Sequence, residues 1–347
     1  MAALPVIALT GYLGAGKTTL LNHVLRAPDA RIGVVINDFG DLNVDASLVT
    51  GQVDEPASIA GGCICCLPDE GGLDGALAKL ADPRLRLDAI IVEASGLAEP
   101  VAVGRMIRFS GVENVRLGGV VDVIDAASHF ETVDRDPSPP ARYSASSLVV
   151  VNKLDQIAER DRAAQLDRIE ARIRESNPAV HVVGAVAGKI DPTLLFDIAD
   201  TVEDSGQLSM RELFLADGRS EPEPHLHLHH RDGTHAASVT VTSTGDVDPG
   251  ALLDLLENPP AGVYRMKGTV AVRSRERSRR YLVNTVGTTI HIGAAPPKAR
   301  TNALVAIGTG LDVDDVRRRA ETAVRPVVGP APTAGFRRLQ RYRKLSI

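Results

Sequence analysis

VIALTGYLGAGKTTL, residues 6–20 of a 347-residue chain, decides how the first part of the protein folds. Its first five residues form an apolar, β-branched run typical of a buried strand. The next eight, Gly11 to Thr18, match the pattern GxxxxGKT, and a helical segment follows from Thr18 to Arg26. In such a P-loop, backbone N–H groups cradle phosphates and the helix N-terminus favours their negative charge. The stretch therefore predicts a nucleotide site on an α/β fold.

The chain up to residue 202 alternates short apolar runs with helical patterns. This alternation is typical of a P-loop NTPase-type α/β fold, a mostly parallel sheet with helices on both faces. The clearest helix covers about 156 to 175, where apolar residues recur on one face. We expect strands at 6–10, 32–36, 89–92, 119–124, 148–151 and 180–183.

Beyond this domain, predicted to span residues 1–202, the pattern changes. Residues 203–235 contain EPEPHLHLHH and are interpreted as a linker rich in His and Pro. Residues 236–328 predict a smaller α+β domain. Its strands are expected at 237–242, 263–273, 280–292 and 302–308, and its helices at 249–257 and 312–324. The tail, 329–347, is rich in Pro, Gly and Arg and is expected to be poorly ordered.

The composition excludes several classes of protein. With 44% hydrophobic and 24% charged residues, the chain is an ordinary globular protein, and its net charge of -5 argues against general nucleic-acid binding. No segment is long and apolar enough to span a bilayer, so we expect no membrane partner. The three cysteines are too close together for a disulfide framework, which favours the reducing cytoplasm. Oligomeric state is left open, and a homodimer is one option.

The residues of the P-loop have distinct expected roles. Lys17 reaches the β and γ phosphates and neutralises charge on the transferred phosphoryl group, and the Thr18 hydroxyl ligates Mg²⁺. The expected phosphate-binding set consists of Gly11, Gly14, Ala15, Gly16, Lys17, Thr18 and Thr19.

A second motif selects the base. Residues 151–155, VNKLD, end a predicted strand and match NKxD. In this motif the aspartate, Asp155, accepts hydrogen bonds from N1–H and the 2-amino group of guanine, and adenine offers neither donor. A buried carboxylate without these partners would penalise ATP by several kcal/mol. Asn152, Lys153 and Asp155 therefore predict GTP as the nucleotide.

A third motif, ExxG, follows another predicted strand in IIVEASG, residues 90–96. Here Glu93 is expected to hold Mg²⁺ through a water molecule, and the Gly96 amide is expected to sense the γ phosphate. Lys17, Thr18 and Glu93 form the expected catalytic set.

All three cysteines lie in one tetrapeptide, Cys63-Ile64-Cys65-Cys66. Thiolates favour zinc and its soft or borderline neighbours, and three in four residues can chelate one ion at little entropic cost. Three adjacent buried cysteines are the alternative. The tetrapeptide lies between the P-loop and Glu93, where GTPases place the switch that orders around the γ phosphate, so hydrolysis could loosen the metal. Water, Asp38, Asp45 or a client side chain could fill the fourth tetrahedral position.

Together these motifs resemble the CobW-type GTPases, which are metallochaperones, from about residue 5 to 310. Two further segments share the resemblance, NDFGD at 37–41 and YRMKG at 264–268. The resemblance implies a GTP-regulated carrier that delivers zinc, cobalt or another transition metal to a client protein. It also implies that Cys63, Cys65 and Cys66 are metal ligands whose affinity depends on bound Mg-GTP.

The chain departs from the family pattern at several positions. Asp38 and Asp41 replace the family's glutamates and are one methylene shorter, and the loop behind the base, residues 185–189, lacks its usual hydroxyl residues. No water-positioning glutamine or arginine finger is identified, so slow intrinsic turnover is expected.

Other hypotheses remain open from the sequence. A P-loop small-molecule kinase is one alternative, although NKxD speaks against it, and a GTPase switch with a redox or structural zinc site is another. Five of the nine histidines lie between 225 and 235. They are consistent either with metal capture or with a solvated linker.

Overall fold

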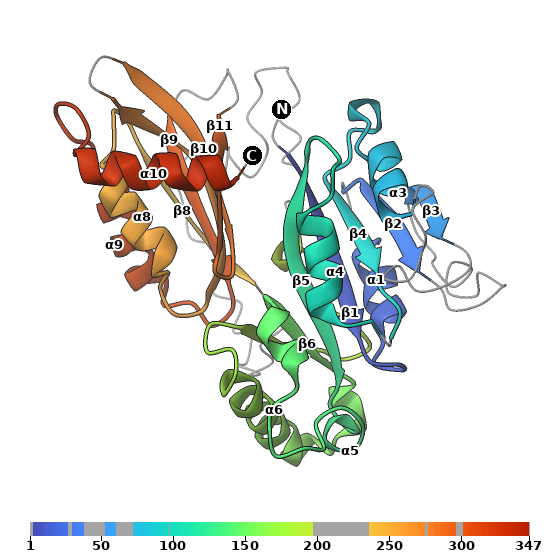
Figure 1. Ribbon diagram of the computed structural model, residues 1–347. Coiled ribbons are helices and arrows are strands. Elements are labelled where there is room, and N and C mark those ends of the chain that lie inside the picture. Colours follow the sequence, from blue (N-terminus) through green and yellow to red (C-terminus); the bar gives the residue numbers. More distant parts are fainter. Residues whose placement is uncertain are drawn as a thin grey trace, which may run out of the picture.

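The computed structural model describes residues 3–26, 30–37, 53–59, 72–96, 98–196, 236–274, 277–295 and 301–346. Within these ranges the chain forms two separate sheets that lie side by side, each with its own helices (Figure 1). The linker predicted at 203–235 lies outside the described residues. No helix in the described part of the chain has the length and apolar character needed to cross a membrane.

The first sheet is parallel and has seven strands in the described ranges, in the order β3-β2-β4-β1-β5-β6-β7. Its strands are β1 (Leu4–Gly11), β2 (Ile32–Asn37), β3 (Val53–Ile59), β4 (Ala89–Glu93), β5 (Val115–Asp125), β6 (Leu148–Asn152) and β7 (His181–Gly184). The helices around it are α1 (Lys17–Val24), α3 (Leu73–Leu80), α4 (Pro100–Arg108), α5 (His129–Thr132) and α6 (Glu159–Arg174). The α/β fold class predicted from the sequence is confirmed.

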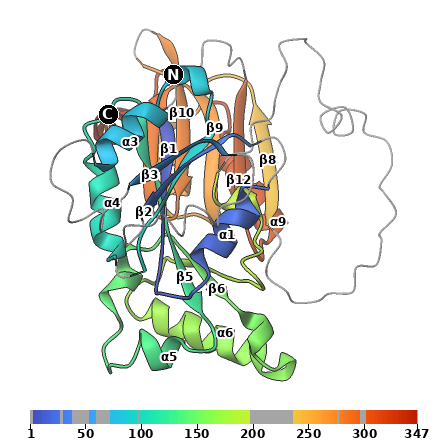
Figure 2. The same cartoon turned by 90° about the vertical axis from the view of Figure 1, so that its right-hand side faces the viewer.

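Both faces of this sheet are buried. Alternate residues of β1 point to opposite sides: Ile7 packs with Leu20 and Leu21 of α1, whereas Val6 packs with α3 and α4. Figure 2 shows α1 on one side of the sheet and α3 and α4 on the other. The nearly continuous apolar strands follow from this double burial.

Strand β3 was not predicted from the sequence. Its sequence, VDEPASI, contains two acidic residues and a proline, which is not a strand pattern. Among the described strands, β3 lies at the edge of the sheet and pairs with β2 alone, and an edge is where a sheet tolerates proline.

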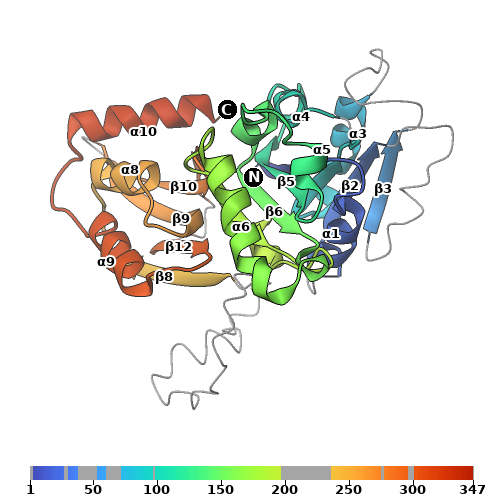
Figure 3. The ribbon, with the colours of Figure 1, turned by 90° about the horizontal axis from the view of Figure 1, so that it is seen from below.

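The second sheet is antiparallel, in the order β11-β10-β9-β12-β8. Its elements are β8 (Ala237–Ser243), α8 (Pro249–Glu257), β9 (Val263–Arg273), β10 (Ser278–Val286), β11 (Thr289–Ala294), β12 (Asn302–Gly308), α9 (Val313–Ala323) and α10 (Thr333–Leu345). Helices α8, α9 and α10 cover its outer face (Figure 3). The single strand expected at 280–292 is wrong: it is a hairpin, β10 and β11, that turns at Gly287, where φ is 54°.

The expectation of a poorly ordered tail at 329–347 is also wrong. Residues 333–345 form α10, and Leu339 on this helix is fully buried in the core of the second sheet. Arg338 binds Asp254 and Glu257 of α8, each at 2.8 Å. The many arginines suggested disorder, but contacts with α8 stabilise the helix, and the sequence pattern does not show those contacts.

The two sheets meet at β7 and β9. The rings of His181 and Tyr264 stack with centroids 5.1 Å apart, and the Tyr264 and Ser147 hydroxyls are 3.1 Å apart. His181 also shares a hydrogen bond of 3.0 Å with Thr309. Burial raises the pKa of Tyr264 to about 12, so its hydroxyl stays protonated. The YRMKG segment thus begins with the residue that docks the second sheet on the first.

Two leucines of α10 test whether this helix belongs to the folded core. Leu339 is fully buried, whereas Leu345 on the same helix is 69% exposed. We expect Leu339→Ala to lower the free energy of unfolding by about 2–5 kcal/mol, because it removes buried apolar contacts and leaves a cavity. Leu345→Ala is the matched control and should change it by less than about 0.5 kcal/mol. Urea unfolding measures both, and equal small effects would contradict the packing of α10.

Protonation of His181 links stability to pH. Burial, and secondly the positive charge of Arg174, lower the pKa of His181 to about 4. The unfolded chain binds this proton near pH 6.5 and the folded protein only near pH 4, so stability falls as the pH drops through this window. We expect His181→Phe, which keeps a ring against Tyr264, to reduce the pH slope of the unfolding free energy.

The reduction should reach at most about 1.4 kcal/mol per pH unit between about pH 6 and pH 4.5. Urea unfolding at a series of pH values measures the slope. Above about pH 7.5 the two proteins should have the same slope, and equal slopes at acid pH would show that His181 is not buried as described.

Candidate functional site

The P-loop joins β1 to α1 through backbone conformations that require glycine. Gly11, Gly14 and Gly16 have φ values of 149°, 76° and 102°. A Cβ on Gly11 would lie 2.6 Å from the Val123 carbonyl oxygen, and one on Gly16 would lie 2.3 Å from the Asn152 amide nitrogen. The loop is therefore packed against β5 and β6 by contacts that only glycine permits.

The start of α1 and the end of β4 meet beside the P-loop. The Thr18 hydroxyl donates a hydrogen bond of 2.8 Å to Oε1 of Glu93, which is 2% exposed at the end of β4. Hydroxyl and carboxylate oxygens are the ligands that Mg²⁺ prefers, so this pair fits the ion that the P-loop pattern implies. Lys17 donates from Nζ to the Gly11 carbonyl at 3.0 Å and so lies over the loop.

The ExxG loop also touches the P-loop. A Cβ on Gly96 would lie 2.8 Å from the backbone nitrogen of Leu13, so only a glycine allows the two backbones to approach this closely. The two loops are therefore in direct backbone contact. The amide of Gly96 is expected to respond to the γ phosphate, and its contact with the P-loop is consistent with that role.

Asn152 connects the P-loop to the loop behind the base. Its side-chain amide donates to the Ala15 carbonyl at 3.0 Å and accepts from the Gly188 amide at 2.8 Å, and the residue is 2% exposed. Gly188 has φ 68°, and a Cβ there would lie 2.7 Å from the Leu20 nitrogen. The 185–189 loop thus holds its place by backbone contacts, without the hydroxyl residues usual in the family.

The other two residues of NKxD differ in their surroundings. Lys153, at φ 62°, donates from Nζ to Asp125 at 2.7 Å. Burial opposes ionisation of Asp125, but the hydrogen bonds from Lys153 and from the Ala127 amide outweigh it and lower the pKa of Asp125. Asp155 is exposed, in the 3-10 turn η4 (Leu154–Gln156). A carboxylate excludes ATP strongly only when it is buried, so selection against ATP requires the bound base itself to cover Asp155.

A buried ion pair behind the P-loop was missed by the sequence analysis. Asp122 is fully buried in β5, and Arg142 binds it through two nitrogens at 2.9 and 2.8 Å. Thr10, which precedes the P-loop, donates to the same carboxylate at 3.0 Å. The pKa of Arg142 is raised. Burial opposes this shift, but the charge and the hydrogen bonds of Asp122 outweigh burial. The available signal was Asp122, an acid with apolar neighbours on both sides in GGVVDVI, residues 118–124.

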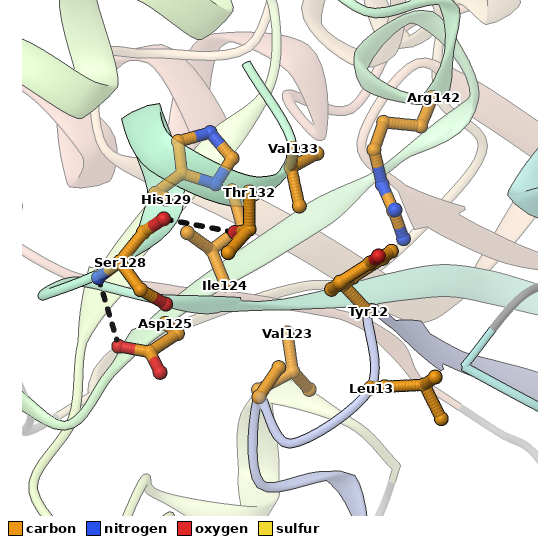
Figure 4. A pocket seen from close by; sticks show the side chains of 11 residues that line it. Tyr12, Leu13, Val123, Ile124, Asp125, Ser128, His129, Thr132, Val133 and Arg142 are labelled. Carbon is orange, nitrogen blue, oxygen red and sulfur yellow. Dashed lines mark hydrogen bonds between the residues drawn. The ribbon is translucent and has the colours of Figure 1, made fainter. Parts of the chain in front are cut away.

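A second network that was not predicted from the sequence begins at a small cleft beside the P-loop. The cleft has a volume of about 10 Å³, which is room for about one water molecule. His129 lines the cleft opposite Tyr12 (Figure 4) and hydrogen-bonds the Tyr143 hydroxyl. Tyr143 donates to Asp134 at 2.9 Å, and Arg172 of α6 binds the same carboxylate. Burial lowers the pKa of His129 to about 4, so its imidazole is neutral near pH 7. The network fixes α5 and α6 against the site.

The residues predicted for the transition metal lie outside the described residues. These are Cys63, Cys65 and Cys66, the candidate fourth ligands Asp38 and Asp45, and the histidines between 225 and 235. The described ranges contain no group of three or more His, Cys, Asp or Glu side chains placed to hold a metal ion.

The end of β3 nevertheless shows where the chain leaves the sheet before the cysteine segment. Ile59 at the end of β3 pairs with Asn37, and Ile36 pairs with Glu93. Ile59 therefore lies two strand spacings across and one residue along from Glu93, about 10 Å away. Because the strands are parallel, the chain leaves β3 at the sheet edge that bears the P-loop.

Two family models match the chain. The one described as "CobW/HypB/UreG, nucleotide-binding domain" matches residues 5–183, and "Cobalamin synthesis protein cobW C-terminal domain" matches residues 236–324. A relative named "Zinc chaperone CobW" from Pseudomonas aeruginosa is 32% identical over 93% of this chain and 92% of its own length. "Zinc-regulated GTPase metalloprotein activator 1" from Dictyostelium discoideum is 28% identical over 59% of this chain and 51% of its own length.

Among solved structures, the Zn(II)-bound YjiA GTPase from E. coli is 20% identical and covers 93% of this chain and 99% of its own. Its TM-score is 0.42.

Replacing Asn152 tests its bridging role. We expect Asn152→Ala to weaken GTP binding at least tenfold, because it leaves the Ala15 carbonyl and the Gly188 amide buried without their partner. Asn177→Ala is a matched control: Asn177 also makes two side-chain hydrogen bonds, to the Tyr143 and Ser146 carbonyls. It should lower stability and leave nucleotide affinity unchanged. Titration with a fluorescent GTP analogue measures both, and equal affinities would disprove the bridge.

Proposed function

Since the chain belongs to the CobW/HypB/UreG family as a CobW-type P-loop GTPase of the metallochaperone group, we propose that its GTP cycle controls a thiolate metal site. In this proposal Cys63, Cys65 and Cys66 hold the transported ion and release it to a client protein. The ion is cargo, whereas Mg²⁺ stays with the nucleotide. The chain spans most of the length of its CobW relative from Pseudomonas aeruginosa, which supports the transfer of the whole activity.

The proposed nucleotide chemistry uses residues of the described site. Lys17 neutralises charge on the transferred phosphoryl group, and Thr18 and Glu93 hold Mg²⁺, with Glu93 acting through water. Bound Mg²⁺ supplies charge at the β and γ phosphates. Asp155 reads guanine, while Asn152 and Lys153 keep the surrounding loops in place.

The position of β3 is the observation that most supports coupling between nucleotide and metal. Cys63 follows Ile59 by four residues, and Ile59 lies about 10 Å from Glu93 at the P-loop edge of the sheet. A segment that starts there is close enough to respond to the γ phosphate and Mg²⁺. We infer that GTP orders the cysteine segment around the metal and that hydrolysis loosens it.

Zinc is the proposed cargo, with cobalt as the next choice. The relatives named as zinc chaperones support zinc, and thiolates suit both ions. Three cysteines leave one tetrahedral position for a water molecule or a client side chain. An open position allows the client to attack the metal before the carrier releases it.

Competitive titration of zinc and cobalt tests the coupling. We expect the reduced full-length protein to bind metal about 5- to 150-fold more tightly with Mg-GTP than with Mg-GDP, the usual range of a coupling free energy. Cys65→Ser should weaken binding in every nucleotide state, because it removes one thiolate. Lys17→Ala should keep the basal metal affinity and lose the response to GTP.

Each outcome separates this proposal from its rivals. Equal metal affinity with GTP, with GDP and without nucleotide would refute the coupling and favour a switch with a structural zinc site. Unchanged affinity in Cys65→Ser would refute the cysteine site itself.

A further inference from the structure

The ion pair of Arg142 and Asp122 lies directly behind the P-loop. Asp122 is fully buried near the carboxyl end of β5, and its strand partner in β1 is Thr10, the residue before Gly11. Arg142 belongs to the 3-10 helix η3 (Ala141–Ala145), which follows α5 in the chain. The pair thus connects a segment outside the sheet to the strand that leads into the phosphate site.

Hydrogen bonds lead from Arg142 toward the lysine of the P-loop. Nε and Nη2 of Arg142 donate to the two oxygens of Asp122 at 2.9 and 2.8 Å, and Oδ1 of this carboxylate also accepts from the Thr10 hydroxyl at 3.0 Å. The carbonyl of the next residue, Gly11, accepts from Nζ of Lys17 at 3.0 Å. The position of the Asp122 carboxylate is therefore linked, through two residues of β1, to the position of the Lys17 ammonium.

Arg142 also reaches a second part of the site. Its guanidinium points toward Tyr12 of the P-loop, and both residues line the small cleft beside the loop (Figure 4). Burial opposes the charge on Arg142, but Asp122 and then the charge of Glu99 raise its pKa, so Glu99 is within electrostatic reach. Glu99 is the N-cap of α4 and follows Gly96 of the ExxG motif by three residues. Arg142 thus lies where the P-loop and the segment after ExxG come together.

The surroundings of the pair favour a role in geometry over a role in stability. Only 11% of the Arg142 side chain is exposed, and none of the Asp122 side chain. Moving two charges out of water costs about as much free energy as their attraction returns, so a buried pair adds little net stability. Two contacts between a planar guanidinium and a carboxylate do fix the orientation of both groups. A pair at this place is therefore suited to hold the neighbouring strand in one position.

We propose that Arg142 is a positioning residue for GTP hydrolysis, which acts on the P-loop through Asp122 and Thr10. It holds the first turn of the loop so that the Lys17 ammonium meets the charge that develops on the transferred phosphoryl group. This role rests on the proposed contact of Lys17 with that group. Many backbone N–H groups of a P-loop hold the phosphates. Loss of one positioning contact should therefore raise the energy of the transition state more than it weakens binding of GTP.

Steady-state GTP hydrolysis by the full chain with Mg²⁺ tests this role. We expect Arg142→Met to lower kcat about tenfold or more and to change the KM for GTP by less than about threefold, because displacing a catalytic group by about 1 Å can cost a factor of about 100. Thr10→Val removes only the hydroxyl and should lower kcat by about three- to tenfold. Arg142→Lys should give an intermediate kcat, because it keeps the charge but not the planar fork of donors.

A double variant separates position from stability. Arg142→Met alone leaves the Asp122 carboxylate buried and unpaired, which can prevent folding. Asp122→Asn combined with Arg142→Met removes both charges, so this protein should fold and melt close to the parent and still show the lower kcat. If the pair were only structural, every folded variant would keep the kcat of the parent.

Arg273→Met is the matched control for the loss of an ion pair. Arg273 binds Asp246 at 2.8 Å in the second sheet, and Asp246 is 9% exposed. This variant also leaves a carboxylate without its arginine, but at a site away from the P-loop. It should lower Tm and leave both kcat and the KM for GTP unchanged.

Lys17→Ala separates this role from the function proposed for the lysine itself. If Lys17→Ala hydrolyses GTP as the parent does, the contact of Lys17 with the phosphoryl group is wrong, and the role of Arg142 with it. If Lys17→Ala loses activity while the folded double variant keeps the kcat of the parent, only the role of Arg142 is overturned. A higher KM with unchanged kcat would also overturn it, because Arg142 would then contribute to binding alone.

Discussion

Asn152 holds the nucleotide site together with a single side-chain amide. It binds the P-loop carbonyl of Ala15 on one side and the Gly188 amide on the other, and it packs where any side chain on Gly16 would collide with it. Both bonds are buried, so neither partner can turn to water instead. The phosphate loop and the base loop therefore keep a fixed distance, and the nucleotide must fit both at once.

The parallel sheet supplies the rest of the arrangement. Because its strands run in one direction, the ends of β1, β4 and β6 meet at one edge with Lys17, Glu93 and Asn152 nearby. Asp122 and Arg142 support this edge from behind. A buried ion pair gains little net stability, but two guanidinium contacts and the Thr10 hydroxyl satisfy this carboxylate well. We infer that the ion pair instead fixes the position of β1, the strand that leads into the P-loop.

The second sheet adds a different kind of surface. Its outer face is covered by α8, α9 and α10, and its inner face is turned toward the first sheet. Tyr264 and His181 fix the two sheets to each other at one corner. The carboxyl edge of the parallel sheet thus serves the nucleotide, and residues at its amino edge line a cavity of about 480 Å³ that the second sheet closes from the other side.

The sequence by itself determined the features that depend on local pattern. GxxxxGKT, ExxG and NKxD each follow an apolar strand, so the fold class and the site edge could be predicted from short stretches. Only the tertiary structure decided the order of the strands, the hairpin at Gly287 and the helix α10, because contacts from distant residues outweigh composition there. The ion pair of Asp122 depends on strand register, which no local pattern specifies.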